Sequence, residues 1–252
     1  MPRRGEADTV RVVRFTYLAA AGAVAAGSAL FSLRASDGLA AHKHHHHRRH
    51  RSSLIPGRPA PREETYKRCG PWGNGGDSVS NYLRNRIDPA TRPHHLTFRQ
   101  FIALDVPKGV ATTPMKHWPA AGRRRVYRHE GMAASLEGYI TTLAVGPKEP
   151  ANCMGKAGYD WHIRLGRSPG APERSTIITE ATPRVRARER GFSLRVLDRY
   201  RRKHVRVRIT GWLFLDNDHS TDLDRQRATL WEIHPVTRIQ VWDRGHWRTI
   251  AG

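Results

Sequence analysis

The chain has 252 residues, enough for one or two ordinary domains, but a mean hydropathy of -0.65 with 38% hydrophobic residues argues against a single fully packed globule. Lysine and arginine number 44 against 22 aspartate and glutamate, a net charge of +22, and only ten of these basic residues lie in residues 1–60. The excess makes an anionic partner such as nucleic acid, anionic lipid or a cell-wall polymer plausible. A basic surface without a specific ligand is favoured over nucleic acid.

The chain has two cysteines, Cys69 and Cys153, and they lie far apart in the sequence. No CxxC or Cys/His finger spacing is present, which argues against a structural zinc site of the usual kind. If the protein is exported, the two cysteines can form one disulfide, and two unpaired structural thiols are the alternative.

Residues 1–41 have the pattern of an export signal. A basic leader precedes the apolar run of residues 15–33, and small residues suited to cleavage follow. The abundance of Ala and Gly favours a cleaved signal peptide, with the mature chain beginning near Ala41, while the length of the run also suits a signal anchor that spans the membrane. Either reading predicts an extracytoplasmic protein that is secreted or associated with the cell envelope.

Residues 42–64 are rich in His, Arg and Pro, and this composition predicts a disordered linker. Histidine clusters bind zinc, nickel or copper weakly, because neutral imidazole is a good ligand for these ions. The neighbouring arginines disfavour a bound cation, so the linker interpretation is favoured over a metal site. The weak metal candidates in this tract are His44, His45, His46 and His47.

A helical lead-in is predicted for residues 65–130. Residues 78–88 fit a short helix capped by Asp77 or Ser78, and residues 96–104 fit another that follows the cap Thr97. Both segments carry apolar residues at helical spacing, so we expect this region to pack on the domain that follows.

From residue 131 onward the apolar residues recur at every second position instead of at helical spacing, which is typical of strands. Five strands are predicted, at residues 132–145, 159–166, 175–185, 205–216 and 228–243. A helix at residues 191–204 separates the third strand from the fourth. This β-β-β-α-β-β order predicts a mainly β fold for residues 131–252, a five-stranded OB-like barrel with an N-terminal α-helical extension. Gly138 in the first strand suits the bend at which such a strand serves both halves of a barrel.

Polar residues alternate with apolar ones along the predicted strands, so that each strand has one polar face. Asp160, His162 and Arg164 share a face of the second strand, and Glu232 and His234 share a face of the last. The apolar residues between them are expected to line the core.

One interpretation is that these polar faces converge. Carboxylates and imidazoles together hold divalent metals or divide acid and base roles in hydrolysis. The candidate catalytic residues are His162, Glu180, Glu232 and His234. The candidate ligand-binding residues also include Asp160, Arg164, Arg206 and Arg208. The competing interpretation is that the two glutamates form ordinary cross-strand ion pairs with Arg206 or Arg208.

Between residues 76 and 242 the motifs DWHIRL, ITEATPR, GWLFLD and LWEIHPVT together resemble a family of uncharacterised bacterial exported proteins. The resemblance implies an OB-like barrel with an N-terminal helical extension and carries no activity with it. A looser likeness is to staphylococcal-nuclease-type OB proteins, which are exported and cleave nucleic acid with calcium, arginines and carboxylates. The chain lacks that family's spaced Arg, Asp, Glu and Arg pattern, so this likeness is an analogy of fold alone.

Two functions fit these observations. The first is an exported OB-like module that binds an anionic or sugar-containing ligand in the cell envelope, with nucleic acid among the candidates. The alternative is a metal-dependent hydrolase, similar to a nuclease or phosphodiesterase, that uses the polar barrel face and a divalent metal. Convergence of the carboxyl and imidazole groups would favour a site, whereas side chains that fan out toward separate arginines would remove most of the basis for an enzyme.

Overall fold

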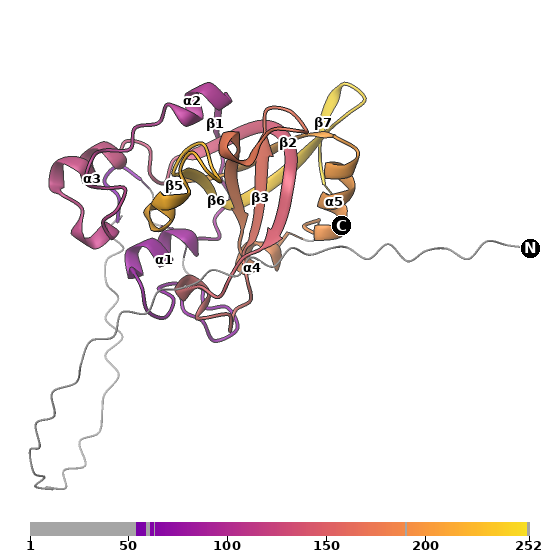
Figure 1. Cartoon of the computed structure of the whole chain (residues 1–252). Coiled ribbons are helices and arrows are strands. Elements are labelled where there is room, and N and C mark those ends of the chain that lie inside the picture. The colour runs from indigo at the N-terminus through magenta and orange to yellow at the C-terminus, as the bar shows by residue number, and fades with distance from the viewer. Residues whose placement is uncertain (1–53, 59–60, 63, 190, 251–252) are drawn as a thin grey trace, which may run out of the picture.

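The computed structural model describes residues 54–58, 61–62, 64–189 and 191–250 (Figure 1). The predicted export signal and the histidine tract lie outside the described residues. Within the described part of the chain, no helix is both long enough and apolar enough to cross a membrane.

Five strands close into a barrel. They are β2 (Ala133–Val145), β3 (Trp161–Gly166), β4 (Ile177–Ala181), β5 (Arg206–Leu215) and β6 (Trp231–Asp243). Their order is β2-β3-β4-β6-β5, and pairing of β2 with β5 closes the ring. The helix α5 (Leu194–Arg202) connects β4 to β5, and β4 pairs with β6 in parallel. The structure confirms the predicted five-stranded OB-like barrel.

Alternation along the strands builds the core of the barrel. The inward residues are aliphatic and at most 2% exposed, among them Leu136, Ile140, Ile163, Leu165, Ile177, Ile209, Ile233 and Ile239. Burial of each such side chain stabilises the fold by about 1.5–3 kcal/mol. The residues of opposite parity on β3, β4 and β6 therefore lie on the outer face of the barrel.

β2 bends at Gly138, as the sequence predicts. The strand pairs with β5 through residues 133–139 and with β3 from Tyr139 onward. A Cβ atom at Gly138 would lie 2.7 Å from the carbonyl oxygen of Gly166 and 3.0 Å from the ring of Phe98. Only glycine allows this close approach of the two strands without a shift in the backbone.

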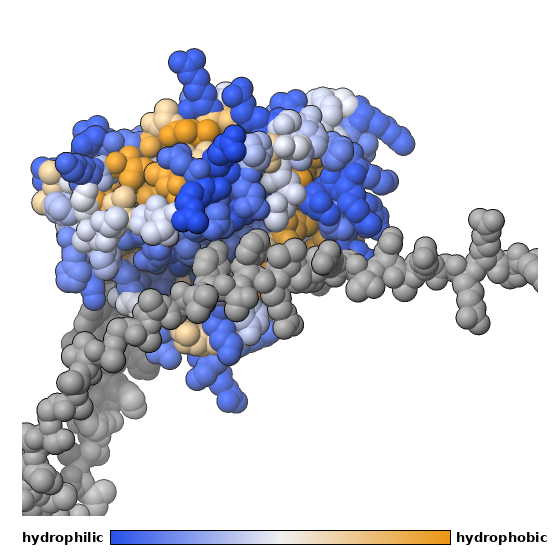
Figure 2. Space-filling model, in the orientation of Figure 1, coloured by the Kyte–Doolittle hydropathy of each residue, from blue (hydrophilic) through white to orange (hydrophobic). Residues whose placement is uncertain are grey.

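The predicted helical extension packs along one side of the barrel (Figure 1). It consists of α1 (Ser78–Arg84), β1 (His94–Leu96), α2 (Phe98–Ile102), the 3-10 turn η1 (Met115–His117) and α3 (Ala120–Val126). Asp77 caps α1, and Thr97 forms a capping box with Gln100 at the start of α2. Figure 2 shows the viewed face of the molecule as largely hydrophilic, with an apolar patch in its upper left part.

Several elements differ from the sequence predictions. The third strand ends at Ala181 rather than at residue 185, because Thr182 caps and Pro183 opens the short helix α4 (Pro183–Arg186). β1 and β7 (His246–Thr249) are additional strands that pair with β2 and β6. Three further 3-10 turns are η2 (Pro150–Asn152), η3 (Glu173–Ser175) and η4 (Asn217–Asp222). Ile55, which falls in the predicted linker, is buried against the core.

Cys69 and Cys153 form a disulfide with their sulfur atoms 2.09 Å apart. The bond joins the segment before α1 to the loop between β2 and β3. The alternative of two unpaired thiols is therefore wrong.

Replacing both cysteines by serine removes a cross-link between residues 84 positions apart. Because the cross-link restricts the unfolded chain, we expect the free energy of unfolding to fall by about 2–5 kcal/mol. Urea unfolding followed by tryptophan fluorescence measures this change, with reduced wild-type protein as the matched comparison. Unfolding midpoints equal to that of the oxidised wild type would contradict the expectation.

Candidate functional site

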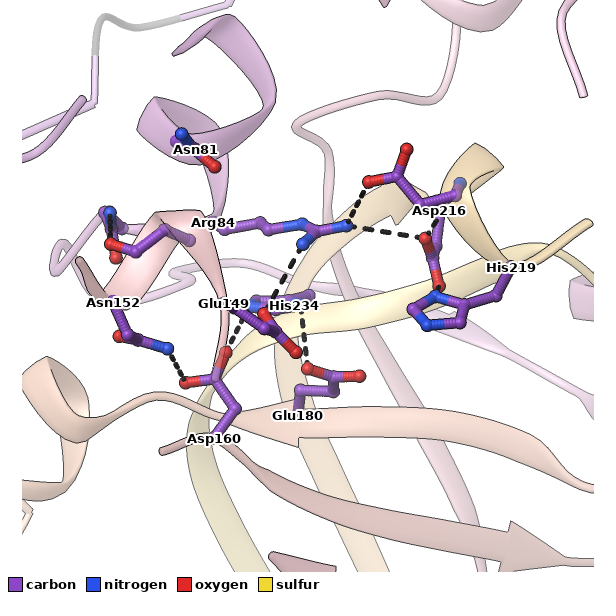
Figure 3. A network of polar contacts seen from close by, with 12 residues as sticks. Asn81, Arg84, Glu149, Asn152, Asp160, Glu180, Asp216, His219 and His234 are labelled. Carbon is purple, nitrogen blue, oxygen red and sulfur yellow. Dashed lines mark hydrogen bonds and ion pairs between the residues drawn. The ribbon is translucent and has the colours of Figure 1, made fainter. Parts of the chain in front are cut away.

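A group of ionisable side chains, the polar cluster, occupies the outer face of β3, β4 and β6 (Figure 3). Its members are Arg84, Glu149, Asp160, His162, Glu180, Asp216, His219, Arg227, Glu232 and His234. The loop between β2 and β3 closes one side of this face and the loop between β5 and β6 closes another. α1 contributes Arg84 from above.

The carboxyl and imidazole groups singled out from the sequence converge on Glu180. The Nε2 atom of His162 lies 3.3 Å from one oxygen of Glu180, and the Nδ1 atom of His234 lies 3.3 Å from the other. The same Nδ1 atom is 3.0 Å from Glu232, and the Nε2 atom of His234 is 3.7 Å from Asp160. Asp160, Glu232 and His234 are each 1% exposed. The five side chains therefore share one buried site.

Strand register explains this convergence. His162 lies directly opposite Glu180 in the antiparallel β3–β4 pair. Thr179 is paired with Ile233 in the parallel β4–β6 contact, so Glu180 has Glu232 and His234 on its other side. Adjacent strands are about 4.8 Å apart, which brings outward side chains within contact distance.

Arg84 reaches from α1 between the two loops (Figure 3). Its guanidinium lies 3.5 Å from Glu149 and 3.4 Å from Asp216, and it stacks 4.9 Å from the ring centre of Phe214. Sequence reasoning missed Arg84 and Glu149 as site residues. A short helix and a loop show no strand alternation, so no periodic pattern marked either residue.

The β5–β6 loop supplies a second set of charges. Arg227 pairs with Asp216 at 2.7 Å and with Glu232 at 2.9 Å. His219 lies 2.7 Å from Asp216 through its Nδ1 atom. The loop residues Asp216, His219 and Arg227 were not among the predicted site residues, although the run DNDHSTD carried a visible concentration of polar groups.

Burial and neighbouring charges raise the pKa values of some groups in the polar cluster and lower that of His162. Burial raises the pKa of Glu180 well above its usual value and that of Glu149 to about 7. Burial lowers the pKa of His162 to about 4, so its ring is neutral near pH 7. The carboxylate of Asp216 raises the pKa of His219 to about 9, which keeps that ring protonated.

The polar cluster has more acidic than basic groups. Its carboxyl groups are those of Glu149, Asp160, Glu180, Asp216 and Glu232, and its cations are Arg84, Arg227 and protonated His219. Without another cation, burial raises the pKa of both Glu149 and Glu180 and so favours their protonated forms. A divalent cation would add positive charge among these carboxyl groups and favour the loss of their protons.

Two overlapping sets of donor atoms fit a metal ion. Glu149, His162 and Glu180 bring three donor atoms within 4.8 Å of one another, and so do Asp160, Glu180 and His234. Within the described chain, the Nε2 atoms of both histidines and the Oδ2 atom of Asp160 are buried and make no hydrogen bond, although they lie 3.3–3.7 Å from carboxyl or imidazole atoms of the cluster. Such atoms are costly to bury unless a ligand satisfies them.

The predicted arginines do not all join this site. Arg206 and Arg208 both pair with Glu137, at 2.5 Å, near the start of β5. The expectation that they pair with Glu180 or Glu232 is therefore wrong, because Glu232 is paired with Phe214 at the other end of β5 and Glu180 lies on β4, which does not pair with β5. Arg164 does lie beside the site and donates to the carbonyl oxygen of Gln226.

A small pocket gives the polar cluster its access to solvent. His162, Glu180, Arg164, His219 and Arg227 line it. It has room for about one water molecule. The side chain of His162 is 17% exposed there, whereas His234 lies deeper.

Comparison with known proteins found no family model that matches the chain, and no significant match among curated proteins or solved structures. The site is therefore interpreted from its own chemistry.

Arg84→Met removes the charge that faces Glu149 and Asp216 while keeping an apolar stem over Phe214. We expect the free energy of unfolding at pH 8 to fall by about 3–5 kcal/mol, because buried carboxylates lose their partner. The loss should be smaller at pH 5, where Glu149, with its pKa of about 7, is already protonated. Urea unfolding at both pH values measures this difference.

The matched control is Arg124→Met, which changes an exposed arginine of α3 and should change stability by no more than about 0.5 kcal/mol. A loss at pH 5 equal to that at pH 8 in Arg84→Met would contradict the proposed charge pairing.

Proposed function

We propose that the polar cluster is the divalent-metal centre of an exported hydrolase that cleaves phosphodiester bonds. The observation that carries this proposal is the convergence of Asp160, His162 and His234 on the carboxyl group of Glu180, with donor atoms buried and without hydrogen bonds. These atoms face one another at 3.3–3.7 Å in ion-pair contacts but form no hydrogen bonds, an arrangement that a shared cation would satisfy.

The orientation of His234 supports a role as a ligand. Its Nδ1 atom lies closer to Glu232, at 3.0 Å, than to Glu180, at 3.3 Å, and Glu232 is itself held by Arg227 at 2.9 Å. A carboxylate that accepts the Nδ1 proton fixes the tautomer in which Nε2 carries the lone pair. In that state Nε2, together with Asp160 and Glu180, presents one nitrogen and two carboxylates to an ion.

The donor set indicates which ions fit. Imidazole suits zinc and other transition ions, carboxylates suit manganese and magnesium, and the set contains no thiolate. Zn²⁺ and Mn²⁺ are therefore the first ions to test. A bound ion of this kind lowers the pKa of a water ligand and polarises a phosphoryl oxygen.

The remaining side chains suit hydrolysis of an anionic substrate. Water oxygen would form a bond to phosphorus as the bond to the leaving oxygen breaks. Glu149, whose carboxyl lies beside Glu180 and His162, would accept the proton from water. His219, at the pocket, would donate a proton to the leaving oxygen, and Arg227 would balance the negative charge.

The place of the site in the fold gives further support. In OB barrels the outer face of the second and third strands, with the loops after the first and fourth strands, is where ligands bind. Here those elements are β3 and β4 with the β2–β3 and β5–β6 loops, and they carry the polar cluster. The disulfide supports an extracytoplasmic location, since such bonds persist in oxidising compartments.

A binding module for an anionic or sugar-containing ligand in the envelope is the second candidate. The same fold position and the net charge of +22 favour it. It differs from the hydrolase in requiring no bound metal, so metal content separates the two.

Metal binding should depend on Glu180 and His234. The histidines at positions 42, 44–47 and 50 are first replaced by glutamine in the full chain, because that tract binds metal by itself. This background protein should bind Zn²⁺ or Mn²⁺ at the cluster and hydrolyse bis(p-nitrophenyl) phosphate until EDTA is added. Glu180→Gln and His234→Ala should each remove both properties, as measured by elemental analysis and release of nitrophenol.

His117→Ala and Glu173→Gln change exposed residues of the same types and serve as controls. A background protein that contains no metal after exposure to either ion, or whose activity survives His234→Ala, would contradict the hydrolase.

Glu232→Gln tests the orientation of His234 separately. Glutamine is similar in size but lacks the charge that pairs with the Nδ1 proton, so metal affinity should fall about 10–100-fold without being abolished. Competition with a zinc-binding dye measures this affinity. Unchanged affinity in Glu232→Gln would show that Glu232 does not act through His234.

A further inference from the structure

We propose that a second site, the arginine groove, binds the backbone of a single-stranded nucleic acid and leads it toward the polar cluster. The groove lies where β1 and α2 meet the bend of β2. It is lined by His95, Leu96, Thr97, Phe98, Arg99, Glu137, Gly138, Tyr139, Arg167 and Arg206. The identity of the ligand as a phosphodiester polymer rests on the proposed function, while the existence of an anion site rests on the groove itself.

The groove has the size of a ligand site. Its volume is about 360 Å³, within the range of about 300–1,000 Å³ that small ligands and single residues of a polymer occupy. Gly138 contributes backbone alone to its floor, and the close approach of Gly166 beneath fixes the shape of the bend. Gly138 and Gly166 lie on β2 and β3 of the barrel.

The charge of the groove is positive. Glu137 is its single acid among the lining residues, and two arginines, Arg206 and Arg208, already pair with that carboxylate at 2.5 Å. Arg99 and Arg167 are exposed and have no acidic partner among the described residues. Guanidinium groups bind phosphate through paired hydrogen bonds, so two unpaired arginines in one groove favour a phosphate-bearing ligand.

The groove and the polar cluster lie on the same outer face of the barrel. Tyr139 is paired with Gly166 at one end of β3, and His162 stands at the other end. Because His162, Arg164 and Gly166 have the same parity, Arg164 lies on this face between the two sites. Gly166 and His162 are four residues apart on β3, which is roughly 13 Å along the strand.

An aromatic side chain in the groove favours a single strand over a duplex. Half-buried Tyr139 lines the groove, whereas Trp247 is not part of the lining and its ring contacts the guanidinium of Arg208, 4.2 Å from the ring centre. An aromatic face in a basic groove stacks on unpaired bases, which a duplex keeps inside its helix. The arginines and Tyr139 of the lining therefore match the phosphate and the base of a nucleotide.

Fluorescence anisotropy with a labelled oligothymidylate of about 12 nucleotides tests the groove. Measurements on the full chain in EDTA do not depend on a metal centre, so failure of the proposed hydrolase leaves this test unaffected. Arg99→Ala/Arg167→Ala should lower the affinity at least about 10-fold at about 50 mM salt and reduce the slope of log affinity against log salt by about 1.4, since two phosphate contacts are lost.

Arg124→Ala/Arg195→Ala removes two exposed arginines of α3 and α5 outside the groove and is the matched control. This control should bind as the wild type does. Unchanged affinity in the groove variant, or an equal loss in the control, would overturn the proposal, and equal affinity for a duplex of the same length would overturn its single-strand character.

Discussion

Burial of carboxyl groups on the outer face of β3, β4 and β6 is the constraint on which the rest of the structure depends. A barrel of this kind needs only its inner face to be apolar, yet here Glu180 and Glu232 are buried on the outside as well. Charges taken out of water require partners or protons. Arg227 pairs with Glu232, and Arg84, which comes from a helix that is not part of the barrel, pairs with the neighbouring Glu149 and Asp216.

The N-terminal extension therefore has a defined physical role. α1 places Arg84 over the polar face, and the disulfide between Cys69 and Cys153 holds the segment before α1 against the β2–β3 loop. That loop carries Glu149 and Asn152, and the amide of Asn152 donates to Asp160 at 3.0 Å. The N-terminal extension, the β2–β3 loop and the strands thus form one connected unit. The excess of acidic over basic groups in the polar cluster lies near Glu180.

Sequence alternation predicted much of this arrangement because side chains two residues apart on a strand share a face. It placed Glu232 with His234 and predicted the five strands, while the glycine at position 138 predicted the bend in β2. Alternation predicts which face of a strand a side chain lies on but not where along that face it lies. Arg206 was therefore predicted to belong to the polar cluster, whereas the pairing of β2 with β5 brings it to Glu137. Arg84 was missed because its contact depends on tertiary packing, and β1 and β7 were missed because three or four residues show little periodicity.

The central claim is that a divalent ion binds beside Glu180. The most direct measurement is anomalous diffraction from crystals of the protein soaked with Zn²⁺, with the histidines at positions 42, 44–47 and 50 replaced. The account predicts an anomalous peak about 2.0–2.2 Å from a carboxylate oxygen of Glu180 and from the Nε2 atom of His234. Zinc bound only at other residues, with the cluster unchanged, would contradict it.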